Sequence, residues 1–242
     1  MSLRRLGAGI KQVAPETALP AGITLPRAET DPERGIGEPL GGGGKRATDL
    51  LIASIALLAA LPVMVLVALL IKLTMGGAVI FAHERVGHGG RRFRCYKFRT
   101  MLPDGDRVLE EHLARHPEHR RAWEMFQKLP VDPRATPLGT VLRRSSLDEL
   151  PQLLNVLAGE MSIVGPRPVT PAELARYGAH GKHYLLARPG LTGLWQVSGR
   201  NLLDYRKRVM LDTSYVRSWS LTLDLWIMLR TIPAVLSPHE TS

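Results

Sequence analysis

Two adjacent carboxylates, Asp148 and Glu149, stand in the densest polar cluster of the sequence, RRSSLDELPQLLNVL. Arg143 and Arg144 lie just upstream, and an apolar segment from about 147 to 157 predicts a helix. Neighbouring side chains on a helix diverge, so the two carboxylates cannot share one proton but can take different roles. With arginines and backbone N–H groups neutralising a phosphate, Asp148 could attack it while Glu149 holds a magnesium ion. The cluster is a candidate phosphoryl-transfer site.

A structural interpretation of the same residues stays open. Ser146, followed three residues later by Glu149, fits a capping box, and acidic residues in a first turn complement the helix dipole. Pro151 argues against a simple cap, because its ring would conflict with the carbonyl group four residues earlier. Spacing alone therefore leaves a structural and a catalytic role as alternatives.

Basic residues outside this cluster are further candidates for binding phosphate groups. Arg167 lies between two prolines that fix the backbone and aim the guanidinium group, although a surface arginine in a turn fits the same pattern. The segment RPGLTGLWQVSGRN could wrap a nucleotide or be an ordinary loop. Its candidate ligands are Arg188, Gln196 and Arg200.

The stretch VIFAHERVGHGGRRFRCYKFRTM predicts two strands around a glycine-rich turn. Phe93, Cys95 and Lys97 alternate with residues that would point to the opposite face. Six basic residues crowd this hairpin, and Lys97 and Arg99 near its end are candidates for binding phosphate.

Residues 104–128 predict a helix that breaks at Pro117, and three histidines in this segment have a spacing that invites a zinc site. They are His112, His116 and His119. Because the proline interrupts the helix, no HExxH pattern is present and the segment is heavily charged, we expect a solvated face instead. Asp212, in an apolar stripe, is expected to be a hydrogen-bonded buried carboxylate.

The segment from Leu50 to Ile71 carries no charge over 22 residues, which as a helix would reach roughly 33 Å, enough to cross a bilayer core. Pro62 in its middle would bend such a helix, and basic residues flank both ends. Since cytoplasmic flanks favour Lys and Arg, a helix that enters one leaflet and returns fits as well as a kinked spanning helix.

The composition and net charge favour some classes of binding partner over others. The chain has 242 residues, a net charge of +10 and a single cysteine, which excludes an internal disulfide framework and a cysteine-based zinc site. The positive charge favours phosphorylated metabolites or anionic lipid head groups. With 5% aromatic residues and no interleaved basic and aromatic motif, nucleic acid is the weaker interpretation. Residues 1–44, rich in Pro and Gly, predict a disordered tail.

Taken together, these segments resemble the bacterial sugar transferase family, the monotopic polyprenyl-phosphate phosphoglycosyl transferases that prime exopolysaccharide, capsule and O-antigen synthesis. The resemblance covers Lys45 to about Leu236, in the family's order and approximate spacing. The matching blocks read KRATD, ERVGHGGRRFRCYKFRTM, DPRATPLG, LRRSSLDELPQLLNVLAGEMSIVGPRPV and RPGLTGLWQVSGRN. Departures are small: His83 stands where many members have glutamine, and Thr100 replaces a frequent serine. The chain is similar to the family's small catalytic form.

For the fold, the resemblance implies a mainly α protein with a small β-hairpin, of the α+β class. Residues 45–73 are expected to form a re-entrant membrane helix broken at Pro62. Residues 74–242 are expected to form a phosphoglycosyl transferase domain on the cytoplasmic face of the bacterial inner membrane. Interfacial amphipathic helices, such as SLTLDLWIMLRTIPAVL, should lie along the membrane.

For the chemistry, the resemblance implies that Asp148 is the nucleophile, that Glu149 helps to hold Mg²⁺, and that Arg143 and Arg167 meet the phosphates. The expected reaction has two steps. Asp148 attacks the β-phosphate of a UDP-sugar and releases UMP, and undecaprenyl phosphate then takes the sugar phosphate from the aspartate. The expected sugar is a hexose, galactose or glucose, and the product would prime exopolysaccharide synthesis.

Two alternatives stay open at this point. In the first, both carboxylates hold metal and the polyprenyl phosphate attacks the UDP-sugar directly, with no covalent intermediate. In the second, the chain is a non-catalytic membrane scaffold of a polysaccharide assembly complex. Besides the two substrates, the expected partners are anionic lipids and not nucleic acid, and the oligomeric state, including a homodimer, stays open.

Overall fold

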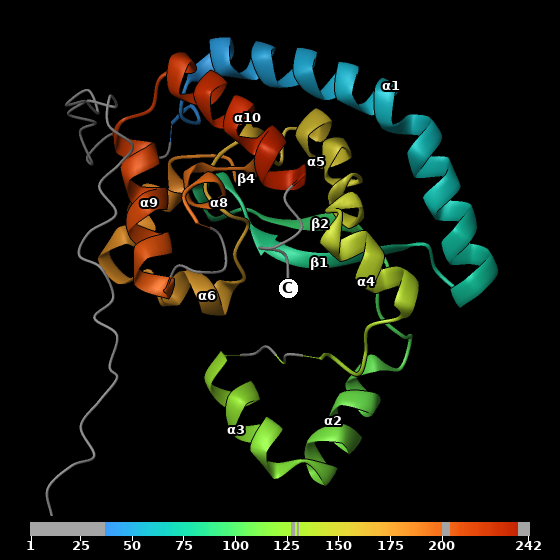
Figure 1. Cartoon of the computed structure of the whole chain (residues 1–242). Helices are drawn as coiled ribbons and strands as arrows, with labels where there is room; N and C mark the ends of the chain where they lie inside the picture. Colours follow the sequence, from blue (N-terminus) through green and yellow to red (C-terminus); the bar gives the residue numbers. More distant parts are fainter. Residues whose placement is uncertain (1–36, 127–128, 130, 200–203, 237–242) are drawn as a thin grey trace, which may run out of the picture.

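The computed structural model describes residues 37–126, 129, 131–199 and 204–236. Helices dominate this part of the chain, with a β-hairpin and a second pair of short parallel strands, so the mainly helical fold with a small hairpin is confirmed (Figure 1). Most of the predicted tail, residues 1–36, lies outside the described residues.

The elements follow in chain order. The helices are α1 (Gly42–Met75), α2 (Gly105–Arg115), α3 (Pro117–Phe126), α4 (Pro137–Arg144), α5 (Gln152–Ala158), α6 (Pro171–Ala175), α7 (Gly181–Leu185), α8 (Leu194–Val197), α9 (Tyr205–Arg217) and α10 (Leu221–Leu236). The 3-10 helices are η1 (His88–Gly90), η2 (Leu147–Glu149) and η3 (Gly178–His180). The strands are β1 (Ile80–Val86), β2 (Arg92–Phe98), β3 (Ser162–Val164) and β4 (Gly190–Thr192).

Within the described residues, α1 is the one helix long and apolar enough to cross a membrane, with a mean hydropathy of 2.8 over its most apolar window. Only 11% of that window is buried, unlike the core helix of a soluble protein. The helix continues through Pro62, and Figure 1 shows it bending part-way along its length. The predicted break at Pro62 is therefore corrected to a bend, since a proline removes only one backbone hydrogen bond.

Charged residues fasten the start of α1, which begins at Gly42, slightly before the predicted boundary, to the rest of the protein. Lys45 Nζ lies 2.5 Å from Asp224 Oδ2 on α10, and both side chains are buried. Arg46 donates to two carbonyl groups at the end of α5, at 2.6 and 2.9 Å. The Asp49 carboxylate accepts hydrogen bonds from the Ser162 hydroxyl and the backbone N–H of β3, both at 2.9 Å. The polar residues before the apolar segment are thus internal anchors.

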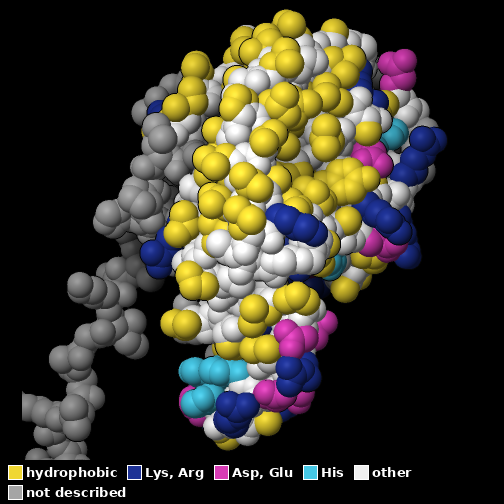
Figure 2. Space-filling view, turned by 90° about the vertical axis from the view of Figure 1, so that its right-hand side faces the viewer, with side chains coloured by type: hydrophobic (Ala, Val, Ile, Leu, Met, Phe, Trp, Pro, Cys, Tyr) yellow, Lys and Arg dark blue, Asp and Glu magenta, His cyan; other side chains and the backbone are white. Residues whose placement is uncertain are grey.

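The other end of α1 packs against the same body. Val67 and Ile71 are buried with Phe98 of β2 and Leu142 of α4 in one hydrophobic cluster. Most of the large apolar residues between the two anchored ends are exposed; Leu58, for example, is 72% exposed, whereas Ala53 is buried in the main core. Both ends of the helix therefore contact one protein domain while its middle offers an apolar surface, the upper region of the face in Figure 2.

The C-terminal helix α10 is amphipathic, as predicted. Leu223 and Ile227 are buried in the main core, whereas Leu225, Leu229 and Ile232 are between 53% and 68% exposed. In Figure 1 it lies beside the first half of α1, and the Lys45–Asp224 ion pair joins the two helices. Its exposed leucines are available to an apolar phase.

The hairpin forms as the alternating pattern predicts. Strands β1 and β2 pair antiparallel, with Ile80 opposite Phe98 and Val86 opposite Arg92. Phe93 and Cys95 are buried on one face of β2, and Lys97 is half-buried on the same face. The predicted break of the next helix at Pro117 is also confirmed, because α2 ends at Arg115 and α3 begins at Pro117.

Helix α4 crosses the end of the hairpin at very close range. Thr136 caps the helix by accepting the N–H of Gly139, and its own N–H donates to the carbonyl oxygen of Thr100 at 3.2 Å. A Cβ atom at Gly139 would lie 1.9 Å from that same oxygen. Only glycine permits this approach, which sets the position of Arg143 one helical turn later.

Gly139→Ala is accordingly expected to destabilise the protein by about 2 kcal/mol, because α4 must move off the hairpin. Thermal unfolding in detergent measures the change. Gly43→Ala is the matched control, since Gly43 is also helical and an added Cβ there meets no atom within 4 Å. Equal melting temperatures for the two variants would contradict the close packing described here.

Candidate active site

Three of the predicted site residues come together at the junction of β2 and η2. Lys97 Nζ lies 2.6 Å from Glu149 Oε1 and 3.8 Å from Asp148 Oδ2. Asp148 is 7% exposed, whereas the side chains of Lys97 and Glu149 are 36% and 39% exposed. One ammonium group thus bridges a buried carboxylate and a partly exposed one.

The backbone at this junction departs from the predicted continuous helix. Ser146 has φ 56°, the single positive φ of a non-glycine residue in the described part of the chain. Residues Leu147–Glu149 form a turn of 3-10 helix, and α5 begins only at Gln152, with Pro151 as its N-cap. The conflict that Pro151 would create inside a helix is resolved by starting the helix after it.

The alternative of a capping box at Ser146 and Glu149 is wrong. Ser146 is in the left-handed region, and its side chain makes no capping hydrogen bond within the described residues. Glu149 instead pairs with Lys97. The left-handed residue turns the chain so that Asp148 points into the protein, and strain of this kind is typical of functional sites.

Ser146→Gly should therefore stabilise the protein by up to about 1 kcal/mol, because glycine adopts this φ without the steric cost that a Cβ carries. Ser145→Gly is the control, since Ser145 has φ −86° and gains nothing from glycine. Thermal unfolding of both variants measures the difference. A melting temperature that falls for Ser146→Gly as much as for Ser145→Gly would contradict strain at this residue.

The electrostatics of the site favour a poised carboxylate. Burial raises the pKa of Asp148 to about 6; Lys97 and Arg143 lower it, and Glu149 adds to the rise. Burial also opposes the charge of Lys97, but Glu149 and Asp148 outweigh it and hold the pKa of Lys97 above its usual value. At neutral pH Asp148 is therefore mostly ionised, yet poorly solvated, the state in which a carboxylate oxygen is most nucleophilic.

Arg143, at the end of α4, is held beside this pair by a network from neighbouring loops. Its Nε donates to Thr100 Oγ1 at 2.9 Å, and its Nη1 lies 3.9 Å from Asp132 Oδ2. Arg134 binds Asp132 in a bidentate manner, with both bonds at 2.8 Å. The contacts with Thr100 and Asp132 thus orient the guanidinium group of Arg143, and its positive charge lowers the pKa of Asp148.

Asn155 of α5, which the sequence analysis missed, positions the strand that carries Lys97. The fully buried Asn155 side chain accepts the N–H of Tyr96 at 3.0 Å and donates to the carbonyl oxygen of Arg94 at 2.7 Å. It thereby satisfies the free edge of β2, as a neighbouring strand would. The only signal in the sequence was a polar residue on the apolar face of a predicted helix.

Arg167 packs against an aromatic ring of α8. Its guanidinium group lies over the Trp195 ring of α8 at 5.6 Å. The pKa of the buried Cys95 thiol, raised to about 11 chiefly by burial, also responds to the charges of Lys97, Glu149 and Arg167. The charges of Lys97, Arg85, Glu149 and Arg167 therefore all act on one thiol, which is buried on β2.

Two further residues lie close to Arg167. Gln196 follows Trp195 on α8. A Cβ atom added at Gly193 would lie 2.7 Å from the Oε1 atom of Gln196 and 2.2 Å from the carbonyl oxygen of Gly165. Gln196 therefore lies close to the segment that leads into Arg167. Asp212 is buried and accepts the Tyr177 hydroxyl at 2.8 Å, as predicted, and burial raises its pKa to about 7.

The remaining predicted ligands lie elsewhere. Arg99 donates to the carbonyl groups of Met75 and Gly76 and thus holds the end of α1. Arg188 donates to the carbonyl oxygen of Gly159 at 2.9 Å, at the opposite end of α5 from Asp148. Arg200 lies outside the described residues. In this structure Arg99 and Arg188 satisfy helix C-termini, and their predicted role in substrate binding stays a prediction.

Comparison of the sequence with models of protein families gives one match that covers most of the chain. The model of the family described as bacterial sugar transferase matches residues 42–238. The chain belongs to this family. The match includes both ends of α1, the hairpin, the Asp148–Glu149 pair and the segments of Arg167 and Gln196, so the resemblance drawn from the sequence is confirmed.

Curated relatives of this sugar transferase carry related names. Exopolysaccharide production protein ExoY of Sinorhizobium fredii is 53% identical over 203 residues, covering 84% of this chain and 90% of the relative. Undecaprenyl-phosphate galactose phosphotransferase of Salmonella typhimurium is 49% identical over 193 residues, covering 79% and 40%. UDP-glucose:undecaprenyl-phosphate glucose-1-phosphate transferase of Escherichia coli is 39% identical over 197 residues, covering 78% and 39%.

The donor atoms of the sugar transferase site suit a magnesium ion. Glu149 offers partly exposed carboxylate oxygens next to the carboxylate of Asp148, and Mg²⁺ prefers such oxygen ligands together with water and substrate phosphates. The two carboxylates already stabilise one positive charge, that of the Lys97 ammonium group, so this part of the surface attracts cations. The residues present therefore fit a magnesium ion held chiefly by Glu149.

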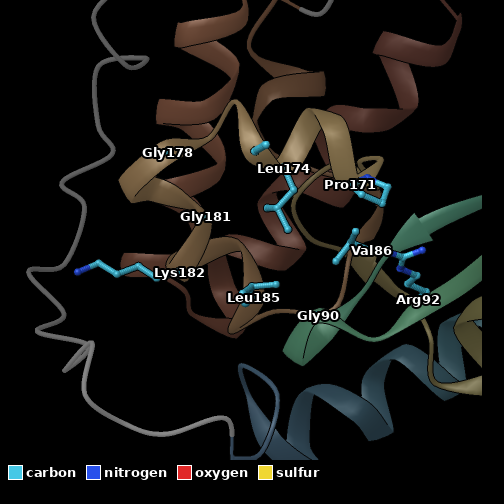
Figure 3. A pocket seen from close by; sticks show the side chains of 10 residues that line it. Val86, Gly90, Arg92, Pro171, Leu174, Gly178, Gly181, Lys182 and Leu185 are labelled. Carbon is cyan, nitrogen blue, oxygen red and sulfur yellow. The ribbon is translucent and has the colours of Figure 1, made fainter.

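A shallow pocket of about 480 Å³ lies on another part of the surface (Figure 3). It is lined by the end of β1 and by α6 and α7, with Val86, Leu174 and Leu185 among its apolar residues, and Lys182 extends away from it. None of the predicted site residues that the structure describes lines this pocket. It is therefore separate from the candidate active site.

Proposed function

We propose that this sugar transferase moves a hexose 1-phosphate from a UDP-sugar to undecaprenyl phosphate, and that the product primes exopolysaccharide synthesis. The names of the relatives support the two substrates and the product class. The observation that carries the proposal is the buried carboxylate of Asp148, with a pKa near 6, beside Lys97 and Arg143.

In the first step, an Asp148 oxygen attacks the β-phosphorus of the donor. The new bond joins that oxygen to phosphorus, the bond from the β-phosphorus to the bridging oxygen breaks, and UMP leaves with the bridging oxygen. The ammonium of Lys97 and the guanidinium of Arg143 offset the repulsion between carboxylate and diphosphate. Because Asp148 is buried, few water molecules compete with it for the phosphorus.

In the second step, an oxygen of undecaprenyl phosphate attacks the sugar phosphate on Asp148. The aspartyl–phosphorus bond breaks, the Asp148 carboxylate is restored, and a polyprenyl diphosphate-sugar is released. Lys97 and Arg143 again neutralise the anionic phosphates that meet at the site. A magnesium ion held by Glu149 would supply further charge neutralisation to the diphosphate.

Membrane attachment brings the acceptor to this site. Both ends of α1 contact the same domain, through Lys45 and Arg46 at one end and Ile71 at the other, while the middle is apolar and exposed. This supports a helix that enters one leaflet and returns, because a spanning helix would place its ends on opposite sides. We therefore place the domain on the cytoplasmic face of the inner membrane, where its net charge of +10 attracts anionic lipids.

The experiment is UMP release from UDP-galactose, UDP-glucose and UDP-N-acetylhexosamines, with and without undecaprenyl phosphate and magnesium. We expect release with one hexose donor, lost on chelation of magnesium. Release of one equivalent without the acceptor favours the covalent route, whereas strict dependence on the acceptor favours direct displacement. No release from any donor would leave the non-catalytic scaffold as the better account.

A further inference from the structure

The corner between α2 and α3 gathers three histidines away from the candidate active site. The ring centroids lie 4.5 Å apart for His112 and His116, 5.0 Å for His112 and His119, and 5.3 Å for His116 and His119. His112 Nε2 is 2.8 Å from His119 Nδ1. Figure 2 shows histidine side chains together at the lower end of the molecule, where Figure 1 places α2 and α3.

The break at Pro117 creates this cluster. The N–H of His116 donates to the carbonyl oxygen of His112 at the end of α2, and the carbonyl oxygen of His116 accepts the N–H of His119 at the start of α3, both at 3.0 Å. The sequence alone predicts that Pro117 interrupts the helix and so disfavours a metal site. In the structure the corner brings the last turn of one helix against the first turn of the next.

A carboxylate completes the set. Glu118 Oε1 lies 3.3 Å from His116 Nδ1, and ligand atoms of His116, Glu118 and His119 lie within 4.8 Å of one another. The neighbouring arginines are engaged by other acids: Arg115 pairs with Glu111, and Arg120 pairs with Glu110. The ion pairs of these two arginines therefore point them to acids outside the cluster.

We propose that His112, His116, His119 and Glu118 bind one divalent transition-metal ion of the zinc class. Imidazole nitrogens suit Zn²⁺, Co²⁺ and Ni²⁺ and disfavour Mg²⁺, so this site differs in chemistry from the Glu149 site. Around a tetrahedral zinc ion with Zn–N bonds of 2.0–2.1 Å, neighbouring ligand atoms lie about 3.4 Å apart. Ligand atoms of His116, Glu118 and His119 lie within 4.8 Å of one another, and His112 Nε2 lies 2.8 Å from His119 Nδ1. Side-chain rotations on this corner would bring the four ligands around one ion.

The bound ion would crosslink α2 and α3. The α2–α3 unit has a small core of its own, in which Leu109 and Leu113 of α2 and Leu129 are buried, with Trp123 of α3 packed against them. Two ligands come from each side of the corner, His112 and His116 from the end of α2 and Glu118 and His119 from α3. A ligand that binds only the folded state stabilises it by mass action, so zinc should raise the melting temperature.

The test titrates the full-length, tag-free chain in detergent with Co²⁺, whose visible absorption separates tetrahedral nitrogen coordination from the free ion. We expect one equivalent to give tetrahedral bands and equimolar Zn²⁺ to displace it. His119→Gln and His112→Gln should each weaken Co²⁺ binding at least tenfold and abolish the rise in melting temperature with Zn²⁺. UMP release should be unchanged in both variants, so failure here is distinct from failure of the proposed function.

His83→Gln is the matched control, because His83 is an exposed histidine on β1 outside the cluster. It should bind Co²⁺ as the unmodified chain does. The proposal is overturned when Co²⁺ gives no tetrahedral bands, or when His119→Gln binds as tightly as His83→Gln. In either case the histidines form a hydrogen-bonded and stacked cluster that holds no metal.

Discussion

Asp148→Asn is expected to lower UMP release by at least about 1000-fold, because the amide cannot form the phosphoryl bond that starts the reaction. The same change should stabilise the folded protein at pH 8 by on the order of 2 kcal/mol, because an ionised carboxylate with a pKa raised to about 6 is disfavoured by burial. Loss of activity with gain of stability is typical of a functional residue and not of a structural one.

The pH dependence of this gain has a defined sign. The usual pKa of an aspartate, 3.8, is lower than the value of about 6 in the folded protein, so the folded state holds the proton more tightly. Stability is therefore lost as pH rises from about 4 through 6, and the asparagine variant escapes this loss. Its gain in melting temperature should be full at pH 8 and should shrink toward zero as the pH falls to about 4.

Asp106→Asn is the matched control, since Asp106 is an exposed aspartate in the first turn of α2. It should leave UMP release unchanged. An Asp148→Asn variant that melts lower than the unmodified chain at pH 8 would show that Asp148 is held by favourable contacts that outweigh its burial.

Lys97→Met is expected to reduce UMP release at pH 7 about 100-fold, by removing a charge that faces the transferred phosphate. It should also change the pH profile. Burial and Glu149 raise the pKa of Asp148 and Lys97 lowers it, so without the lysine that pKa rises further. The acidic limb of the rate profile, which the ionisation of Asp148 controls, should then move to higher pH.

Two controls separate this role from a general loss of charge. Arg92→Met removes an exposed cation on the same strand, paired with Glu84, and should leave the profile unmoved. Lys97→Arg keeps the charge and should keep the acidic limb near its original position. A Lys97→Met variant whose rate falls without any movement of that limb would contradict coupling between Lys97 and Asp148.

Local patterns predicted the elements around the site well. The hairpin follows from alternation at Phe93 and Cys95, and the break between α2 and α3 follows from Pro117. These features depend on neighbours in sequence, which a single chain reveals. The pairing of Lys97 with both carboxylates joins residues about fifty positions apart, and only the packing of η2 against β2 creates it.

Other features depend on contacts that residue types do not specify. Arg99 and Arg143 both looked like phosphate ligands, but Arg99 holds carbonyl groups at the end of α1, whereas Arg143 lies beside Asp148. The left-handed Ser146 and the late start of α5 were indicated only by the conflict at Pro151. The role of Asn155 had no clear signal in the sequence. Its buried amide completes the edge of β2, and this contact exists only once the two elements pack together.

The most direct test of the covalent mechanism is to incubate the purified protein with its UDP-hexose donor and magnesium, without undecaprenyl phosphate, and to analyse acid-quenched peptides by mass spectrometry. We expect one hexose phosphate on the peptide that contains Asp148, and its disappearance when undecaprenyl phosphate is added. An unmodified peptide from a preparation that forms polyprenyl diphosphate-sugar once acceptor is supplied would contradict the covalent mechanism.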